Sequence, residues 1–191
     1  DRTARQFVDQ VQRGQTLRLA NAGVEPVAQR LGRIGMTFAA HHEGRRLREV
    51  KEHELILQAN VLINVPVLKS HGGATLTVAM KNLMGVVWDR GEWHANNLHQ
   101  CIADFASYRK PDLNVVDAYN VLMRHGPRGV SAADVANMKS LLLSTDLVTA
   151  DAAAARLFGL ELDAVGYIGI AHEMGVGRKD LENLAIRRIA L

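Results

Sequence analysis

The stretch "VLINVPVLKSHGGATLTVAMKNLMGV", residues 61–86, changes from an apolar run into a polar, glycine-containing segment. Its first part shows little alternation of apolar and polar residues, which is typical of a central strand covered on both faces in an α/β sheet. Pro66 has no N–H to donate to a sheet ladder, so we expect the strand to break or end beside it. Lys69 and His71 then precede a glycine pair. Strand ends of this kind are where open α/β sheets hold their ligands, because loops and helix N-termini converge there.

Helical and extended patterns alternate along the rest of the chain. We expect helices at residues 3–14, 24–35, 53–60, 97–111, 145–159 and 164–177. We expect strands at residues 61–68, 113–119, 138–144 and 184–191, with two more within residues 36–50. This alternation predicts the α/β class, with a mostly parallel sheet, helices on both faces and a single compact domain.

The composition belongs to a folded protein, because 48% of the residues are hydrophobic and 23% are charged. The net charge of +3 is spread over residues of both signs, as in "GRRLREVKEHE" (44–54), which favours a solvated face over a nucleic-acid-binding one. No apolar run approaches the ~18 residues of a membrane span. The chain begins at Asp1 without a signal peptide, which fits a trimmed product and leaves cytoplasm and export both open.

The single cysteine, Cys101, excludes an internal disulfide and an iron–sulfur cluster held by this chain alone. It falls on the apolar face of the helix expected at 97–111, so we interpret it as a packing residue. His94 and His99 are five residues apart, which is the wrong spacing for a two-histidine metal site on one helix. His94 can still reach the strand-end site from a loop.

The polar segment after the first strand is the main candidate site. Lys69 supplies a point charge suited to a phosphate or a carboxylate, and Gly72 and Gly73 let backbone N–H groups approach a ligand. His71 has an ordinary pKa near working pH, which suits a general acid or base. The alternative is a simple turn with a solvated lysine and a surface histidine. Neither a Walker A loop nor a G-x-G-x-x-G pattern is present.

Further candidates lie at other predicted element ends. Lys81, next to Asn82, is flanked by apolar residues, so it either meets a ligand or extends its amine to solvent. Asp117 ends a strand, where a carboxylate is catalytic, binds a metal or caps a turn. Asp151 falls in an apolar helical stripe, so we expect it to be buried and either paired or ligating. His125 lies in "RHGPRG" (124–129), a loop of the sort that lines clefts.

Four blocks of the chain carry a resemblance to a known family. They are "LINVPVLKSHGGATLTVAMKNLMGVV" (62–87), "LHQCIADFASYRKPDLNVVDA" (98–118), "LLLSTDLVTADAAAARLFGL" (141–160) and "YIGIAHEMGVG" (167–177). In this order they resemble domain-of-unknown-function family 362, over a core at roughly residues 55–180, and residues 1–54 fit more loosely. The family is bacterial and archaeal, and many members carry ferredoxin-type iron–sulfur modules or export signals.

The resemblance implies the same site residues as the residue-level reading. The matching positions are Lys69, His71, Lys81, Asn82, Asp117, Gly126, Pro127, Asp146 and Asp151. The chain departs from the family at Leu147, where proline is usual, so the start of that helix can differ. It also lacks a cysteine motif, so an iron–sulfur role implies a partner protein or domain.

We therefore expect an enzyme whose strand-end cleft binds an anionic small molecule in a redox-associated setting. The cleft is expected to gather Lys69, His71, Lys81, Asn82, Asp117 and Asp151. In this hypothesis His71 is the general acid or base, and Asp117 or Asp151 orients it or holds a divalent metal. The alternative is a non-enzymatic metal- or ligand-binding module, or a docking partner of an iron–sulfur protein. A third interpretation is that these polar groups form a buried structural network.

Overall fold

The structure is a computed structural model of the chain. It describes residues 36–40, 44–88 and 90–189. The chain divides into two compact units, one formed by Asp1–Gly35 with Ala185–Leu191 and the other by Met36–Leu184. All helices and strands named below belong to the second unit, which is described by itself. The helices expected at 3–14 and 24–35 lie outside the described residues.

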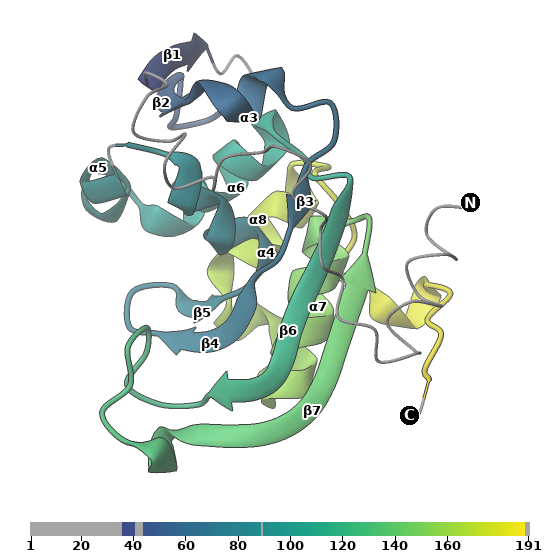
Figure 1. Ribbon diagram of the computed structural model, residues 1–191. Coiled ribbons are helices and arrows are strands. Elements are labelled where there is room, and N and C mark those ends of the chain that lie inside the picture. Colours follow the sequence, from purple (N-terminus) through teal and green to yellow (C-terminus); the bar gives the residue numbers. More distant parts are fainter. Residues whose placement is uncertain (1–35, 41–43, 89, 190–191) are drawn as a thin grey trace, which may run out of the picture. The chain divides into compact units, whose positions relative to one another are not determined.

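Seven strands and six α-helices are defined among the described residues (Figure 1). The strands are β1 (Met36–Ala40), β2 (Glu49–His53), β3 (Ile63–Asn64), β4 (Val67–His71), β5 (Thr75–Thr77), β6 (Leu113–Leu122) and β7 (Val135–Ser144). The helices are α3 (Glu54–Gln58), α4 (Ala79–Asn82), α5 (Arg90–Ala95), α6 (Leu98–Tyr108), α7 (Leu147–Phe158) and α8 (Gly166–Glu173). Short 3-10 turns occupy Leu83–Val86, Ala132–Asp134, Leu162–Ala164 and Leu181–Asn183.

β6 is the central strand of a five-stranded mixed sheet. It runs parallel to β3 and β4 and antiparallel to β7, while β5 is antiparallel to β4. β1 and β2 form a separate antiparallel pair. The α/β class predicted from the alternation of patterns is confirmed, with antiparallel partners at both edges of the sheet.

Pro66 separates β3 from β4, as predicted from its missing N–H. Its carbonyl oxygen still accepts a hydrogen bond from the N–H of Asp117, at 2.8 Å, so the strand pair stays in contact across the break. The strand predicted at 184–191 is wrong for its described part, because residues 184–189 form neither strand nor helix. Ile186 and Ile189 are exposed there. A short apolar run becomes a strand only where a partner pairs with it.

The described helices α4, α7 and α8 lie against one face of the sheet (Figure 1). The core lies on this side, where Val116, Val148 and Ile168 are fully buried. On the other face Val67 and Leu141 are exposed. Helices on both faces are therefore not confirmed for the described part of the chain.

The ends of the long helices follow from local sequence. Asp146 caps α7 by accepting hydrogen bonds from the N–H groups of Val148 and Thr149, and the helix begins at Leu147 without the family's proline. It ends at Gly159, whose φ of 87° is the left-handed conformation that glycine adopts without strain. No helix among the described residues has the length and apolar character needed to cross a membrane.

Candidate functional site

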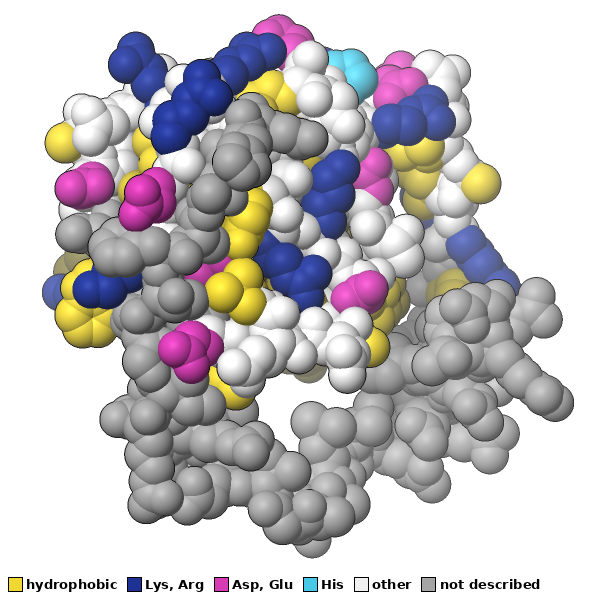
Figure 2. All heavy atoms as spheres, turned by 90° about the horizontal axis from the view of Figure 1, so that it is seen from above, with side chains coloured by type: hydrophobic (Ala, Val, Ile, Leu, Met, Phe, Trp, Pro, Cys, Tyr) yellow, Lys and Arg dark blue, Asp and Glu magenta, His cyan; other side chains and the backbone are white. Residues whose placement is uncertain are grey.

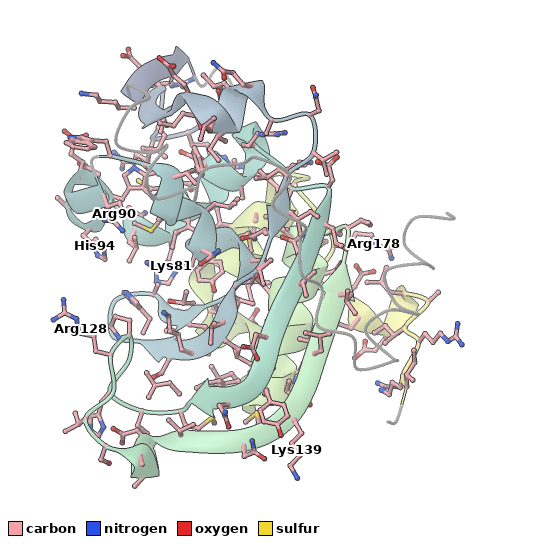
Figure 3. The ribbon with its side chains drawn as sticks, viewed as in Figure 1. Lys81, Arg90, His94, Arg128, Lys139 and Arg178 are labelled. Atoms are coloured by element: carbon pink, nitrogen blue, oxygen red, sulfur yellow. The ribbon has the colours of Figure 1, made fainter. Side chains whose placement is uncertain are left out.

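A pocket of about 350 Å³ lies beside the end of β4. The described residues that line it are Lys69, His71, Thr77, Lys81, Asn82, Met84, Gly85, Arg90, His94 and Pro127. Lys81 comes from α4, and Arg90 and His94 come from α5. Figure 3 shows these three side chains gathered on the same side of the ribbon.

The β4–β5 hairpin forms one wall of the pocket. Lys69 pairs with Thr77 across the two strands, and residues two apart on a strand share a face, so His71 lies on the same face. The opposite face carries Leu68 and Leu76, both fully buried in the core. The alternation of the strand thus directs a lysine, a histidine and a threonine toward the pocket.

His71 is held by the turn that follows it. Its Nδ1 accepts hydrogen bonds from the N–H groups of Gly73 and Ala74, both at 3.1 Å, so the neutral ring carries its proton on Nε2. Burial, together with the positive charges of Lys81, His94 and Lys69, lowers the pKa of His71 to about 4. His71 is therefore a neutral N–H donor near pH 7, whereas its ordinary pKa predicts a group that titrates there.

The two glycines of this segment form the β4–β5 turn and do not line the pocket. Gly73 acts through its N–H on His71. Its Cα lies close to both histidine rings, since a Cβ added there would be 3.8 Å from His71 and from His94. The rings of His71 and His94 are themselves stacked, with centroids 6.1 Å apart.

Positive charge dominates the pocket. Burial lowers the pKa of Lys81, and the nearby charges of Arg90 and Lys69 lower it further. No Asp or Glu occurs among the described residues that line the pocket. The arrangement suits an anion, because an opposite charge would relieve the mutual repulsion of these cations.

Asp151 is buried and paired, as predicted, but it does not line the pocket. Its carboxylate reaches from α7 to the start of α4, where it accepts hydrogen bonds from the N–H groups of Ala79 at 2.7 Å and Met80 at 3.2 Å. Burial raises its pKa to about 8, against the effect of these two bonds. Asp151 thus fixes the helix that carries Lys81.

A chain of side-chain amides fixes α4 from the other side. The Nδ2 of Asn82 donates to the Oδ1 of Asn64 at 2.8 Å. The Nδ2 of Asn64 in turn donates to the carbonyl oxygen of Ala79 and to the Oδ1 of Asn114, both at 2.9 Å. Lys81 and Asn82 therefore enter the pocket from a helical turn that is tied to β3, β6 and α7.

Asp117 and His125 do not line the pocket either. Asp117 lies half-buried on β6, and its Oδ1 accepts a hydrogen bond from the N–H of Tyr119, which is the local turn-type bond expected of an aspartate. His125 contacts Asp134 at 2.8 Å within the loop that joins β6 to β7. The same loop reaches the pocket through Pro127. The site proposed below therefore contains neither Asp117 nor Asp151.

Two lining residues, Thr77 and Arg90, are absent from the sequence-based candidates. The register of a hairpin closed by the glycine pair places Thr77 opposite Lys69, so this position follows from the sequence once the turn is assigned. Nothing in the local sequence marks Arg90, because its place depends on how α5 packs. His94 lines the pocket from a helix, in place of the loop expected for it.

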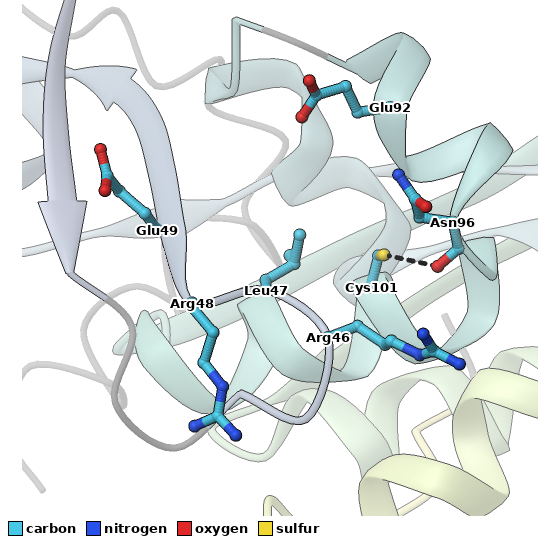
Figure 4. A pocket seen from close by; sticks show the side chains of 7 residues that line it. All are labelled: Arg46, Leu47, Arg48, Glu49, Glu92, Asn96 and Cys101. Carbon is cyan, nitrogen blue, oxygen red and sulfur yellow. Dashed lines mark hydrogen bonds between the residues drawn. The ribbon is translucent and has the colours of Figure 1, made fainter.

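The described residues offer no group of three or more His, Cys, Asp or Glu side chains arranged to hold a metal ion. A second pocket, of about 260 Å³, is lined by residues of both charge signs (Figure 4). Cys101 lies at its base and donates to the carbonyl oxygen of Asn96 at 3.3 Å. Burial, followed by the charge of Asp104, raises the pKa of the thiol to about 11, so Cys101 stays protonated and acts in packing, as predicted. The face seen in Figure 2 likewise intersperses basic and acidic side chains.

Fold and pocket together define an α/β domain with a cationic site at the end of a sheet strand. Residues 10–156 match the family model described as "Domain of unknown function (DUF362)", so the chain belongs to this family. It is also similar to the thylakoid-associated protein sll1697 of Synechocystis sp., with 32% identity over 103 residues. That match covers 50% of this chain and 31% of the relative, so the chain spans about a third of the relative's length. No solved structure matches the chain.

Proposed function

We propose that the pocket beside β4 binds an anionic small molecule as the substrate of an enzyme. The observation that carries this proposal is the lining itself, which supplies Lys69, Lys81 and Arg90 and, among its described residues, no carboxylate. Partly buried cations without a counter-charge are costly, and the lowered pKa of Lys81 reflects that cost. An anion is the ligand that offsets it.

The place of the pocket in the fold supports a substrate site. Open α/β sheets bind substrates outside the carboxyl ends of their strands, and Lys69 and His71 lie at the carboxyl end of β4. The redox-associated setting rests on the family resemblance alone. Cys101 is the chain's single cysteine and is buried, so an iron–sulfur cluster would come from a partner protein or domain.

Titration calorimetry at low ionic strength tests the binding of sulfate, inorganic phosphate and succinate. We expect at least one of these anions to bind, and Lys81→Gln to weaken that binding about tenfold or more, because Gln keeps the size but removes the charge. Lys139→Gln is the matched control, since Lys139 is exposed on β7 and does not line the pocket. The proposal fails if the native protein binds none of the three anions, or if both variants bind as it does.

A further inference from the structure

We infer that the pocket wall formed by the β4–β5 hairpin is a subsite for a phosphoryl group, with the hydroxyl of Thr77 and the Nε2–H of His71 as its neutral donors. This inference rests on the proposed anion site and names the class of anion. It adds Thr77, which belongs to no site predicted from the sequence.

The first observation is the state of the Thr77 hydroxyl. Thr77 is 7% exposed and lines the pocket, and its Oγ1 is buried without a hydrogen-bond partner among the described residues. Buried hydroxyl groups in folded proteins are almost always hydrogen-bonded, because an unsatisfied one costs free energy. A ligand oxygen that accepts from Oγ1 removes that cost.

The second observation is the orientation of His71. Its Nδ1 is occupied by the N–H groups of Gly73 and Ala74, which leaves Nε2–H as the ring's remaining hydrogen-bonding group. In the neutral ring this group donates and cannot accept. His71 therefore favours a ligand group made of acceptors, as Thr77 does.

The third observation is the number of donors around one position. Lys69 lies opposite Thr77 on the hairpin, and Lys81 enters the same pocket from α4. Two ammonium groups and two neutral donors exceed what the two oxygens of a carboxylate need. A phosphate offers more oxygens and up to two negative charges, and lysine is a common partner of phosphate. The donor set thus favours a phosphoryl group over a carboxylate.

Calorimetric titration of the native chain with inorganic phosphate, and separately with succinate, tests this assignment. We expect phosphate to bind about tenfold more tightly than succinate, and Thr77→Val to weaken phosphate binding by about fivefold to tenfold. Thr77→Ser keeps the hydroxyl and should bind as the native protein does. Thr145→Val, at an exposed threonine between β7 and α7, is the control for the change of side chain.

A spectroscopic titration of the native protein is independent of any variant. With ¹⁵N-labelled histidine, phosphate should shift the Nε2 resonance of His71, whereas succinate should shift it less. An unchanged resonance with bound phosphate overturns the inference.

The outcomes separate this inference from the proposed function. If succinate binds as tightly as phosphate, or if Thr77→Val binds phosphate as the native protein does while Lys81→Gln does not, the phosphoryl subsite is wrong and the anion site stands. If neither phosphate nor succinate binds and sulfate also fails, the anion site itself is wrong.

Discussion

At the scale of single residues, the carboxylate of Asp151 shows how a buried polar group serves the site without touching it. It is fully buried, and its two oxygens accept from the N–H groups of Ala79 and Met80 at the start of α4. Those N–H groups belong to the first turn of a helix, where no intrahelical partner exists. Asp151 takes the place of that missing partner, and Lys81 follows one residue later.

We expect Asp151→Ala to lower the free energy of unfolding by roughly 2–4 kcal/mol, because it leaves the N–H groups of Ala79 and Met80 buried without acceptors. Urea unfolding followed by circular dichroism measures this change. Asp163→Ala is the matched control, since Asp163 is exposed and only pairs with Lys179 at 3.6 Å, so its loss should change stability by about 0.5 kcal/mol or less. Equal stability of the two variants would contradict a structural role for Asp151.

At the scale of elements, the loop between β6 and β7 is attached to β4 at a point of very close approach. The N–H of Gly126 donates to the Oγ of Ser70 at 3.0 Å, and a Cβ at Gly126 would overlap the carbonyl oxygen of Ser70. Inside the loop, the N–H of Val130, the ring of His125 and further backbone bonds lower the pKa of Asp134 to about 2. The loop is thus internally ordered and delivers Pro127 to the pocket.

Gly126→Ala should detach this loop from β4, because the new methyl group has no space against Ser70. We expect faster tryptic cleavage at Arg124 or Arg128 and weaker anion binding, since Pro127 leaves the pocket wall. Limited proteolysis followed by mass spectrometry gives the rate and the cleavage site. Gly91→Ala is the control, because a Cβ there meets nothing within 4 Å. A cleavage rate equal to that of the native protein would show that the loop tolerates the methyl group.

At the scale of the whole molecule, the cationic pocket links stability to pH. The pKa of His71 in the folded protein, about 4, lies below its ordinary value of 6.5. Between these values the unfolded chain binds more protons than the folded one, so this residue makes the free energy of unfolding fall as pH decreases from 6.5 to 4. Asp151 acts in the opposite direction, because burial raises its pKa to about 8. The wild-type slope is therefore a sum of opposing contributions.

A comparison with His71→Gln isolates the contribution of His71, since glutamine keeps an N–H donor but does not titrate. Urea unfolding at about pH 7 and about pH 5 should show that the native protein loses more stability on acidification than the variant does. The comparison also cancels the contribution of Asp151, which is present in both proteins. The same loss in both would mean that His71 keeps an ordinary pKa in the folded state.

Much of the fold follows from local rules that need no tertiary contact. Pro66 breaks the strand because it has no N–H, Asp146 caps α7 because its side chain replaces missing helical acceptors, and Gly159 ends that helix with a positive φ. The burial of Asp151 follows from its place in an apolar stripe. Lys69 and Lys81 were recognisable as site residues because each is a charged group inside or next to apolar sequence.

What only the tertiary structure decided depends on packing between segments far apart in the chain. Arg90 joins the pocket because α5 packs beside β4, Asp117 stays outside it because its carboxylate bonds locally, and Asp151 meets backbone N–H groups in place of a ligand. The state of His71 has the same origin, since burial and neighbouring cations set its pKa. By itself the sequence determined element boundaries, the α/β class and most of the cationic side chains, because these depend on short-range geometry and periodicity. Partners, protonation and the composition of the pocket were decided by long-range contacts, because burial and charge act through space and not along the chain.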